Sequence, residues 1–378
     1  MFTHWRLSSF YFFYFASLGT LLPYWSLYLD SLGFSAFQIG EIMAVILITK
    51  AIVPNLIGWI ADHTGKSLSI IRLCSFLSAS FFTLIFLDQS YYWVILVMVL
   101  FSSFWNSVLP QFEVITLNHI KDNTHLYSKI RIWGSIGFIT TATLIGPVLD
   151  LINISILPII LTLLFALIWF SSLWVQECKT QHPIQHHTTL LNILKRPEVI
   201  AFIIVAFLSQ VAHGPYYAIY SLFLKSHQYS QSIIGLLWTT GVIAEIIVFW
   251  VVYKYFKNIK LKLILVGSLL LASIRWFCIG SLIDYGWMIF LAQLLHAATF
   301  ATFHLASINL THNFFSGKNQ SRGQALYSSV SYGAGGAVGS MYGGYCWEQF
   351  GPEIAFYTAA IIALIAAMVA YIWITKET

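Results

Sequence analysis

Residues 153–175 read NISILPIILTLLFALIWFSSLWV and contain no charged side chain. A helix needs about 20 apolar residues to cross the hydrocarbon core of a bilayer, and this stretch is long enough. The whole 378-residue chain is similar, with 58% hydrophobic and 9% charged residues and a mean hydropathy of +0.78. A water-soluble domain carries roughly 25% charged residues, so lipid must surround much of this chain.

Eleven further apolar runs accompany this stretch. The twelve predicted spans lie near 7–30, 38–61, 69–87, 91–117, 130–150, 153–175, 198–224, 231–253, 261–281, 286–312, 323–347 and 354–375. We therefore expect an all-α membrane protein with twelve transmembrane helices, in two six-helix halves (1–176 and 198–378) around a central cavity. The first run follows Arg6 without a small-residue cleavage site, which indicates a retained helix rather than a removed signal peptide.

Basic residues gather on one side of the predicted bilayer. With a cytoplasmic N-terminus, Lys225 lies outside, Lys50 and Arg275 lie within spans, and the other 16 of the 19 Lys and Arg residues lie on or near the cytoplasmic side. This bias follows the positive-inside rule and places both termini in the cytoplasm of a bacterial inner membrane. The net charge of +5 is then a signal of topology and gives no support to a nucleic-acid partner. We expect a monomer in the lipid bilayer.

The longest polar stretch, 177–197, is expected to be a cytoplasmic linker between the halves. It contains His182, His186 and His187, which could bind a metal, but no acidic or thiol groups cluster with them and a solvated linker is favoured. The four cysteines show no paired spacing, so the sequence predicts neither a disulfide framework nor a thiolate metal site.

The predicted turn after the second span reads GWIADHTGKS (58–67). Gly58, Asp62, Gly65 and Lys66 fit the Gly-x-x-x-Asp-x-x-Gly-Arg/Lys pattern of the loop between helices two and three of the major facilitator superfamily, which this loop resembles. The resemblance implies that Asp62 helps to latch one conformation. A tight turn without a latching role is the alternative.

Ionisable groups within predicted spans cost several kcal/mol unless they are paired or hydrated, so each is a candidate functional residue. The candidates are Glu41, Lys50, Glu113, Arg131, His213, Glu245, Arg275, His296 and His304. Glu245 and Arg275 fall near the middle of adjacent spans, so we expect them to pair directly, either for proton coupling or as a structural ion pair. His296 and His304 are eight residues apart and are expected to share a helical face near that pair, as part of the site or as packing residues.

In the first half, Glu113 ends one span and Arg131 begins the next, so the two groups are expected to meet. Arginine offers a planar fork for carboxylates or hydroxyls, although Arg131 could instead be a topology charge. Lys50 has no obvious partner except Glu41 or a substrate anion. The aromatic residues that could wall a site for a planar substrate, or simply pack, are Tyr24, Trp25, Trp133, Tyr216 and Tyr217.

Six stretches carry a more specific resemblance: LPYWSLYLDSLGFS (22–35), YSKIRIWGSIGF (127–138), QVAHGPYYAIYSLFL (210–224), GVIAEIIVFW (241–250), IRWFCIG (274–280) and QLLHAATFATFHLA (293–306). On these the chain resembles the phenylpropionate permease group of the major facilitator superfamily over nearly its whole length. This resemblance implies import of a small aromatic carboxylate.

A more distant resemblance is to the lactose permease group of oligosaccharide/proton symporters. It implies a substrate-binding role for Glu113 and Arg131 and a proton-coupling role for Arg275 and His296. The position three residues after His296, acidic in that group, is Thr299 here. The acid of the eighth helix is shifted by about one turn, to Glu245, which leaves Glu245 as the expected proton carrier.

Together these patterns predict a secondary transporter that imports a small aromatic carboxylate with protons and needs no cofactor. Glu245, Arg275, His296 and His304 are the expected proton-coupling residues. The expected substrate-binding residues are Glu113, Arg131, Lys50, Trp25, His213 and Tyr217. A sugar or nucleoside proton symporter is the alternative. A membrane enzyme is disfavoured because the sequence contains no HExxH, GxSxG or phosphate-binding loop.

Overall fold

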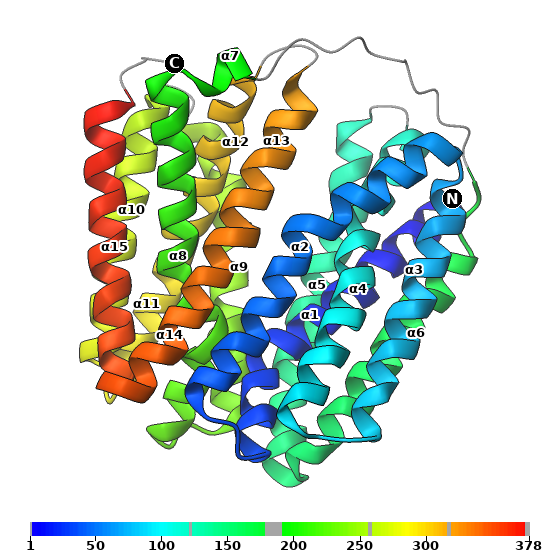
Figure 1. The fold of residues 1–378 in the computed structure, drawn as a ribbon, viewed down its shortest axis with the longest axis horizontal. Coiled ribbons are helices and arrows are strands. Elements are labelled where there is room, and N and C mark those ends of the chain that lie inside the picture. The colour runs from blue at the N-terminus through cyan, green and yellow to red at the C-terminus, as the bar shows by residue number, and fades with distance from the viewer. Residues whose placement is uncertain (1, 121–122, 178–190, 256–258, 316–318, 375–378) are drawn as a thin grey trace. The chain divides into compact units, whose positions relative to one another are not determined.

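The computed structural model describes residues 2–120, 123–177, 191–255, 259–315 and 319–374, and these residues form helices and short connections without a strand (Figure 1). The first half of the sequence forms six long helices. They are α1 (Phe2–Ser31), α2 (Ala36–Thr64), α3 (Ser67–Phe82) continued by the turn η1 (Thr83–Phe86), α4 (Tyr91–Ile120), α5 (Thr124–Leu151), and α6 (Leu157–Leu173) preceded by the turn η2 (Ile154–Ile156).

The second half of the sequence adds the short α7 (Leu191–Leu194) and six more long helical segments. They are α8 (Pro197–Ser226), α9 (Gln231–Tyr255), α10 (Leu261–Ser281), α11–η3–α12 (Gly286–His296, Ala297–Ala301, Thr302–Phe314), α13–η5–α14 (Gln320–Ser328, Ser329–Gly335, Gly336–Phe350) and α15 (Pro352–Trp373). The turns η3 and η5 are π-helical, a feature that the sequence does not predict. Such turns insert a residue into an α-helix and often occur at functional sites.

Ten of the helices that the structure describes are long and apolar enough to cross a membrane. α1, with 30 residues, and the α13–η5–α14 segment complete the twelve long segments that the sequence predicts. The chain is therefore an all-α, multi-pass membrane protein. The observed helices overrun most of the predicted spans by a few residues because a helix continues into the polar interface beyond the hydrocarbon.

Large apolar side chains remain exposed on the outward faces of the helices, as expected for a lipid-facing surface. Leu144 of α5, Leu163 of α6 and Ile361 of α15 are each about 60% exposed. Trp174 and Trp373 are exposed just beyond the end of α6 and at the end of α15, where amphipathic rings favour the membrane interface.

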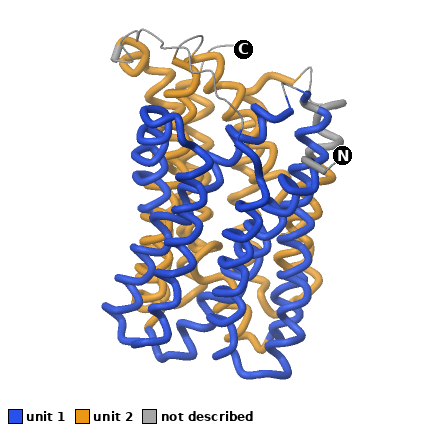
Figure 2. The backbone as a smooth tube through the Cα atoms, turned by 90° about the vertical axis from the view of Figure 1, so that its right-hand side faces the viewer, with its two compact units in different colours: residues 1–34, 48–183, 229–236 blue, residues 35–47, 184–228, 237–378 orange. Residues whose placement is uncertain are grey.

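The chain folds into two compact units, coloured separately in Figure 2. Unit 1 comprises Met1–Phe34, Ile48–Pro183 and Tyr229–Leu236. Within it, α1 packs along α5 and α6, and α3 packs on α4 and α6. The α1–α5 contact is close because a Cβ on Gly137 would lie 2.2 Å from the carbonyl oxygen of Phe12. Only glycine permits this approach of two backbones.

Unit 2 comprises Ser35–Leu47, Ile184–Gln228 and Leu237–Thr378. Within it, α8 packs against α14, α15 and η5, and α10 packs against α15 and α12. A Cβ on Gly214 of α8 would lie 2.0 Å from the backbone of Gly339 of α14, so these two helices touch through their backbones. α8 is the most buried of the candidate spans. This packing fixes the rotation of the helix that carries His213, Tyr216 and Tyr217.

Candidate functional site

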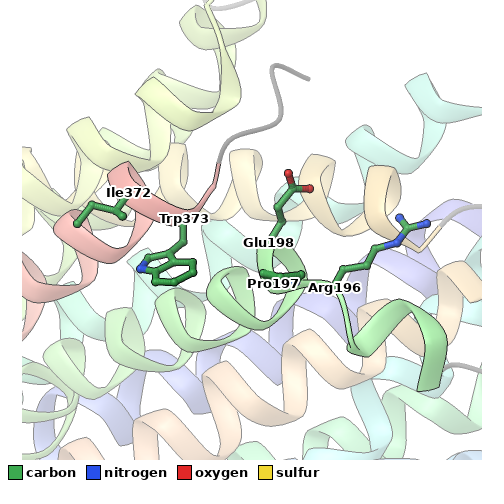
Figure 3. Close-up of a pocket in the computed structure, with 5 residues that line it drawn as sticks. All are labelled: Arg196, Pro197, Glu198, Ile372 and Trp373. Carbon is green, nitrogen blue, oxygen red and sulfur yellow. The ribbon is translucent and has the colours of Figure 1, made fainter.

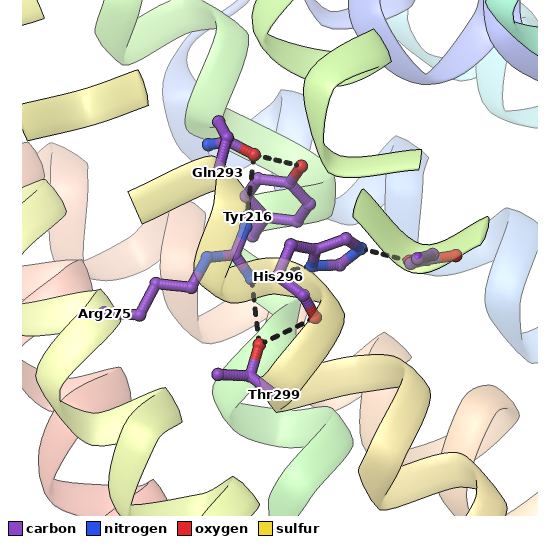
Figure 4. Close-up of polar contacts among 6 residues, drawn as sticks. Tyr216, Arg275, Gln293, His296 and Thr299 are labelled. Carbon is purple, nitrogen blue, oxygen red and sulfur yellow. Dashed lines mark hydrogen bonds and ion pairs between the residues drawn. The ribbon is translucent and has the colours of Figure 1, made fainter. Parts of the chain in front are cut away.

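A buried arginine organises the polar interior of unit 2. Arg275 of α10 is 0% exposed. Its Nη1 lies 2.8 Å from Nδ1 of His296 and 3.4 Å from Oγ1 of Thr299, and its Nη2 lies 3.3 Å from Oε1 of Gln293 (Figure 4). The guanidinium carbon also lies 4.5 Å from the ring centroid of Tyr216, a cation–π contact that suits a desolvated cation.

Glu245 reaches this cluster through histidine rather than through arginine. Oε1 of Glu245 on α9 lies 2.7 Å from Nε2 of His296. The prediction of a direct Glu245–Arg275 pair is therefore wrong: within the described residues His296 bridges the two charges. The reason is that α11 inserts its histidine between α9 and α10, and the second guanidinium nitrogen is turned towards Gln293.

The bridge fixes the tautomer of His296. Arginine nitrogens only donate hydrogen bonds, so Nδ1 of His296 must accept from Nη1 of Arg275 and carries no proton. Nε2 then bears the ring proton and donates it to Glu245. A second proton on His296 would require the Arg275 contact to break. Glu245 is thus the group in this chain of contacts that can exchange a proton without breaking the Arg275–His296 bond.

Two tyrosines and a glutamine hold the arginine in place, a role that was not predicted from the sequence. The Tyr216 hydroxyl donates to Oε1 of Gln293 at 3.0 Å, and Nε2 of Gln293 donates to the Tyr220 hydroxyl at 2.5 Å. Gln293 and His296 are three residues apart on α11, and Tyr216 and Tyr220 are four apart on α8. That helical spacing was the available signal, because each pair occupies one face of its helix.

His304 lies on the same side of its helical segment as His296. Phe300 stacks between them, with ring centroids 5.3 Å from His296 and 6.3 Å from His304. A π-helical turn contains more residues than an α-helical turn, so η3 brings the eight-residue step close to two full turns. Nδ1 of His304 forms a 2.8 Å hydrogen bond with the Tyr332 hydroxyl. His304 therefore belongs to the edge of the cluster, one ring further along.

His213 of α8 is buried beside the same cluster. Its Nδ1 donates to the carbonyl oxygen of Ser209 at 2.8 Å, since a carbonyl can only accept. Nε2 is then an acceptor, and it has no hydrogen-bond partner in the structure. The ring packs edge-on against Trp276 at 4.9 Å and lies 6.2 Å from the ring of Tyr217. Both predicted substrate residues of the second half, His213 and Tyr217, thus lie beside the cluster of Arg275, His296 and Glu245.

In unit 1, Glu113 and Arg131 meet as expected. Oε1 of Glu113 on α4 lies 3.9 Å from Nε of Arg131 on α5, and both side chains are about one-third exposed. The Arg131 guanidinium carbon lies 4.1 Å from the ring of Phe15 and 5.5 Å from that of Tyr11, both on α1. The site therefore combines a partly accessible cation with aromatic rings, a pairing that could bind both ends of an aryl carboxylate.

Of the other two predicted substrate residues of unit 1, Trp25 lies in the core and Lys50 is electrostatically coupled to Glu113. Trp25 is 0% exposed and packs on Tyr28 and Phe82, with ring centroids 5.0 and 5.6 Å away. This environment is that of a core residue. The Lys50 side chain on α2 is exposed, and its charge interacts electrostatically with the Glu113 carboxylate. Glu41 lies on the part of α2 that belongs to unit 2.

The predicted latch motif forms the α2–α3 connection. α2 ends at Thr64, the Gly65 N–H closes the last turn by bonding the carbonyl oxygen of Ala61, and the positive φ of +63° at Gly65 then turns the chain out of the helix. Lys66 then precedes α3 as its N-cap residue. Gly58 faces Gln111 of α4, whose Nε2 would lie 3.0 Å from an added Cβ. Asp62 is exposed in the last turn of α2. Gly65 is thus required by the turn itself, whatever Asp62 does.

A surface pocket lies elsewhere in unit 2, where α8 begins and α15 ends. Arg196, Pro197, Glu198, Ile372 and Trp373 line it (Figure 3). It contains none of the predicted site residues.

Comparison with known proteins agrees with this fold. The sequence model of the MFS_1 like family matches residues 4–358. The chain is 27% identical over 359 residues to a probable 3-phenylpropionic acid transporter of Escherichia coli (strain K12), covering 94% of this chain and 93% of the relative. It is 23% identical over 378 residues to a maltose permease of Geobacillus stearothermophilus, covering 97% and 94%.

Solved structures share the architecture. A crystal structure of a mutant of the nucleoside transporter NupG superposes with a TM-score of 0.88 at 18% sequence identity, covering 99% of this chain and 100% of that chain. At this identity the likeness shows the fold alone.

Proposed function

Because the chain belongs to the MFS_1 like family, we propose that this secondary transporter couples the import of a small aromatic carboxylate, of the 3-phenylpropionate type, to protons. The observation that carries the coupling is the buried series Arg275–His296–Glu245. We place it in a bacterial inner membrane as a monomer, with both termini in the cytoplasm.

Charge balance explains how such a series can couple two ions. With Glu245 ionised, its charge and that of Arg275 cancel across the neutral His296. With Glu245 protonated, Arg275 is left with an uncompensated positive charge. A substrate anion bound elsewhere in the transporter then restores charge balance, and a low-dielectric interior strengthens that long-range attraction. Binding of a proton thus favours binding of a monocarboxylate, and the pair is carried without net charge.

The substrate class rests on two supports. The first is the relative from Escherichia coli, a probable 3-phenylpropionic acid transporter. The second is the Arg131 site, where Phe15 and Tyr11 flank the guanidinium and Glu113 is only 3.9 Å away. An arriving carboxylate would compete with Glu113 for Arg131, while the aryl ring would contact the aromatic side chains.

A sugar or nucleoside proton symporter is the second candidate. The maltose permease relative and the NupG likeness favour it, and an Arg–Glu pair also suits hydroxyl groups. The carboxylate is preferred because the probable 3-phenylpropionic acid transporter is more similar in sequence to this chain than the maltose permease is.

Uptake of radiolabelled substrates into membrane vesicles tests the proposal. The panel is 3-phenylpropionate, maltose and uridine, each with an imposed inward proton gradient, with and without a protonophore. We expect concentrative uptake of 3-phenylpropionate that the protonophore abolishes. Concentrative uptake of maltose or uridine alone would refute the carboxylate assignment, and uptake indifferent to the protonophore would refute proton coupling.

A further inference from the structure

Two helix N-termini are capped by carboxylates that come from distant parts of the chain. Asp150, at the end of α5, accepts hydrogen bonds from the backbone N–H groups of Gln231 and Ser232 at the start of α9, at 2.8 and 3.0 Å. Glu348, at the end of α14, accepts from the hydroxyl of Ser35 at 2.6 Å and from the N–H of Phe37 at 3.1 Å, where α2 begins. The first contact lies within unit 1 and the second within unit 2.

The two capped helices begin in the same way. GFSAFQIG (33–40) precedes and opens α2, and QYSQSIIG (228–235) does so for α9. Gly33 and Gln228 have positive φ angles of 86° and 66°, and Gln228 is the one non-glycine residue with a positive φ in the described chain. Each segment then has a serine before the helix, Ser35 or Ser230, and a glycine five residues later, Gly40 or Gly235. Equivalent residues of the two segments are 195 positions apart.

The capping helices repeat each other as well. Gly146 and Asp150 are four residues apart on α5, as are Gly344 and Glu348 on α14, and each equivalent pair is separated by 198 positions. A Cβ on Gly146 would lie 2.6 Å from the carbonyl oxygen of Gln231, and one on Gly344 would lie 2.4 Å from that of Ala36. In both contacts a glycine thus brings the backbones together and an acid one turn later caps the helix.

Each contact joins a helix of the first six spans to a helix of the second six. Its polar atoms are exposed to solvent, and the glycines add close backbone contact with little apolar area. An exposed cap of this kind stabilises a helix end by about 1 kcal/mol. Such a contact is strong enough to bias a conformational equilibrium and weak enough to break in each cycle of a transporter.

We propose that Asp150 and Glu348 are the two equivalent parts of one duplicated latch, whose contacts with the starts of α9 and α2 must both break for transport to proceed. The inference rests on the transporter function proposed above and is independent of the identity of the substrate. It also makes the two contacts interdependent: loosening one loosens the other, although they lie in different units.

Reversible cross-linking tests whether the Asp150 and Glu348 contacts must break during transport. In a chain whose four native cysteines are replaced by serine, Asp150→Cys with Ser232→Cys, or Glu348→Cys with Ser35→Cys, is joined by a short bis-methanethiosulfonate, which forms a disulfide bond with each thiol and releases sulfinate. The control pair is Ser268→Cys with Thr302→Cys, whose hydroxyls are 2.6 Å apart on α10 and α12, both in the second six spans. We expect each latch cross-link to reduce uptake at least tenfold and a reducing agent to restore it, whereas the control cross-link leaves uptake unchanged. Unchanged uptake in the cross-linked latch variants would overturn the proposal.

A second measurement needs no substrate, so it separates failure of the latch from failure of the substrate assignment. Ala142 and Ser340 are equivalent, fully buried positions, and their carbonyl oxygens face Gly235 and Gly40 beneath the two caps. A cysteine at either position reports opening by its reaction with a maleimide in detergent-purified protein. We expect Asp150→Ala to raise reactivity about fivefold at both reporters, the factor that ~1 kcal/mol supplies. Asp150→Asn, which keeps an acceptor oxygen, should raise it less. A rise at Ala142→Cys alone, or at neither position, would refute the interdependence.

Discussion

Nε2 of His296 lies 2.7 Å from Oε1 of Glu245, while Nδ1 of the same ring lies 2.8 Å from Nη1 of Arg275. One imidazole therefore separates the two opposite charges in the interior of unit 2. The arginine acts on only one side of the ring and so fixes which nitrogen carries the proton. This arrangement assigns different tasks to three neighbouring residues: Arg275 supplies the charge, His296 transmits it, and Glu245 exchanges the proton.

Glu245→Gln should abolish proton-driven accumulation and leave substrate exchange measurable. Glutamine keeps an acceptor for His296 but cannot take up or release a proton, so the cluster is held in the charge state of the protonated protein. We expect accumulation in vesicles with an imposed pH gradient to fall at least tenfold, with counterflow retained. Glu353→Gln, at the start of α15, is the matched control and should accumulate substrate normally. Normal accumulation by Glu245→Gln would remove Glu245 from the coupling role.

His296→Ala should destabilise the protein more than His296→Gln. Alanine leaves a buried guanidinium nitrogen without its acceptor, at a cost of about 1–3 kcal/mol, more for a charged group. Glutamine has both an acceptor oxygen for Arg275 and a donor nitrogen for Glu245. Thermal unfolding in detergent measures the difference. Equal midpoints for the two variants would show that the bridge contributes nothing to stability.

The helices and their polar residues could be predicted from the sequence, whereas their partners could not. Apolar length located all twelve segments, and the charges within them marked Arg275, His296 and Glu245. Direct pairing of Glu245 with Arg275 was predicted from depth alone, but contact also depends on helix rotation and on what lies between, and here the His296 ring contacts both groups. The π-helical turn η3 changes the direction of every residue after it and has no reliable sequence signal. Gln293 and Tyr216 carry no net charge, so the pattern of ionisable residues within the spans gives no sign of their role.

Arg131→Ala should weaken substrate binding about tenfold or more without preventing folding. The guanidinium is partly exposed and pairs with Glu113 at a long 3.9 Å, so its removal leaves no fully buried partner. Loss of a charge-assisted hydrogen bond to a carboxylate costs roughly 1.5–3 kcal/mol. Titration calorimetry of the purified protein with 3-phenylpropionate measures the change, and Lys129→Ala in the same helix is the control. Unchanged affinity would reduce Arg131 to a residue that sets topology.

Gly65→Ala should destabilise the α2–α3 connection, and Gly267→Ala should not. Gly65 has φ of +63°, a conformation that costs an alanine about 1–2 kcal/mol, although open space surrounds the position. Gly267 lies inside α10, also with no atom within 4 Å of an added Cβ, and there alanine gains up to about 1 kcal/mol of helix propensity. The two substitutions thus add the same methyl group with opposite expected effects on the unfolding midpoint in detergent. If Gly65→Ala and Gly267→Ala shifted the unfolding midpoint in the same direction, the positive φ of Gly65 would not be what stabilises the turn. Asp62 would then be the next residue of this connection to test by the same measurement.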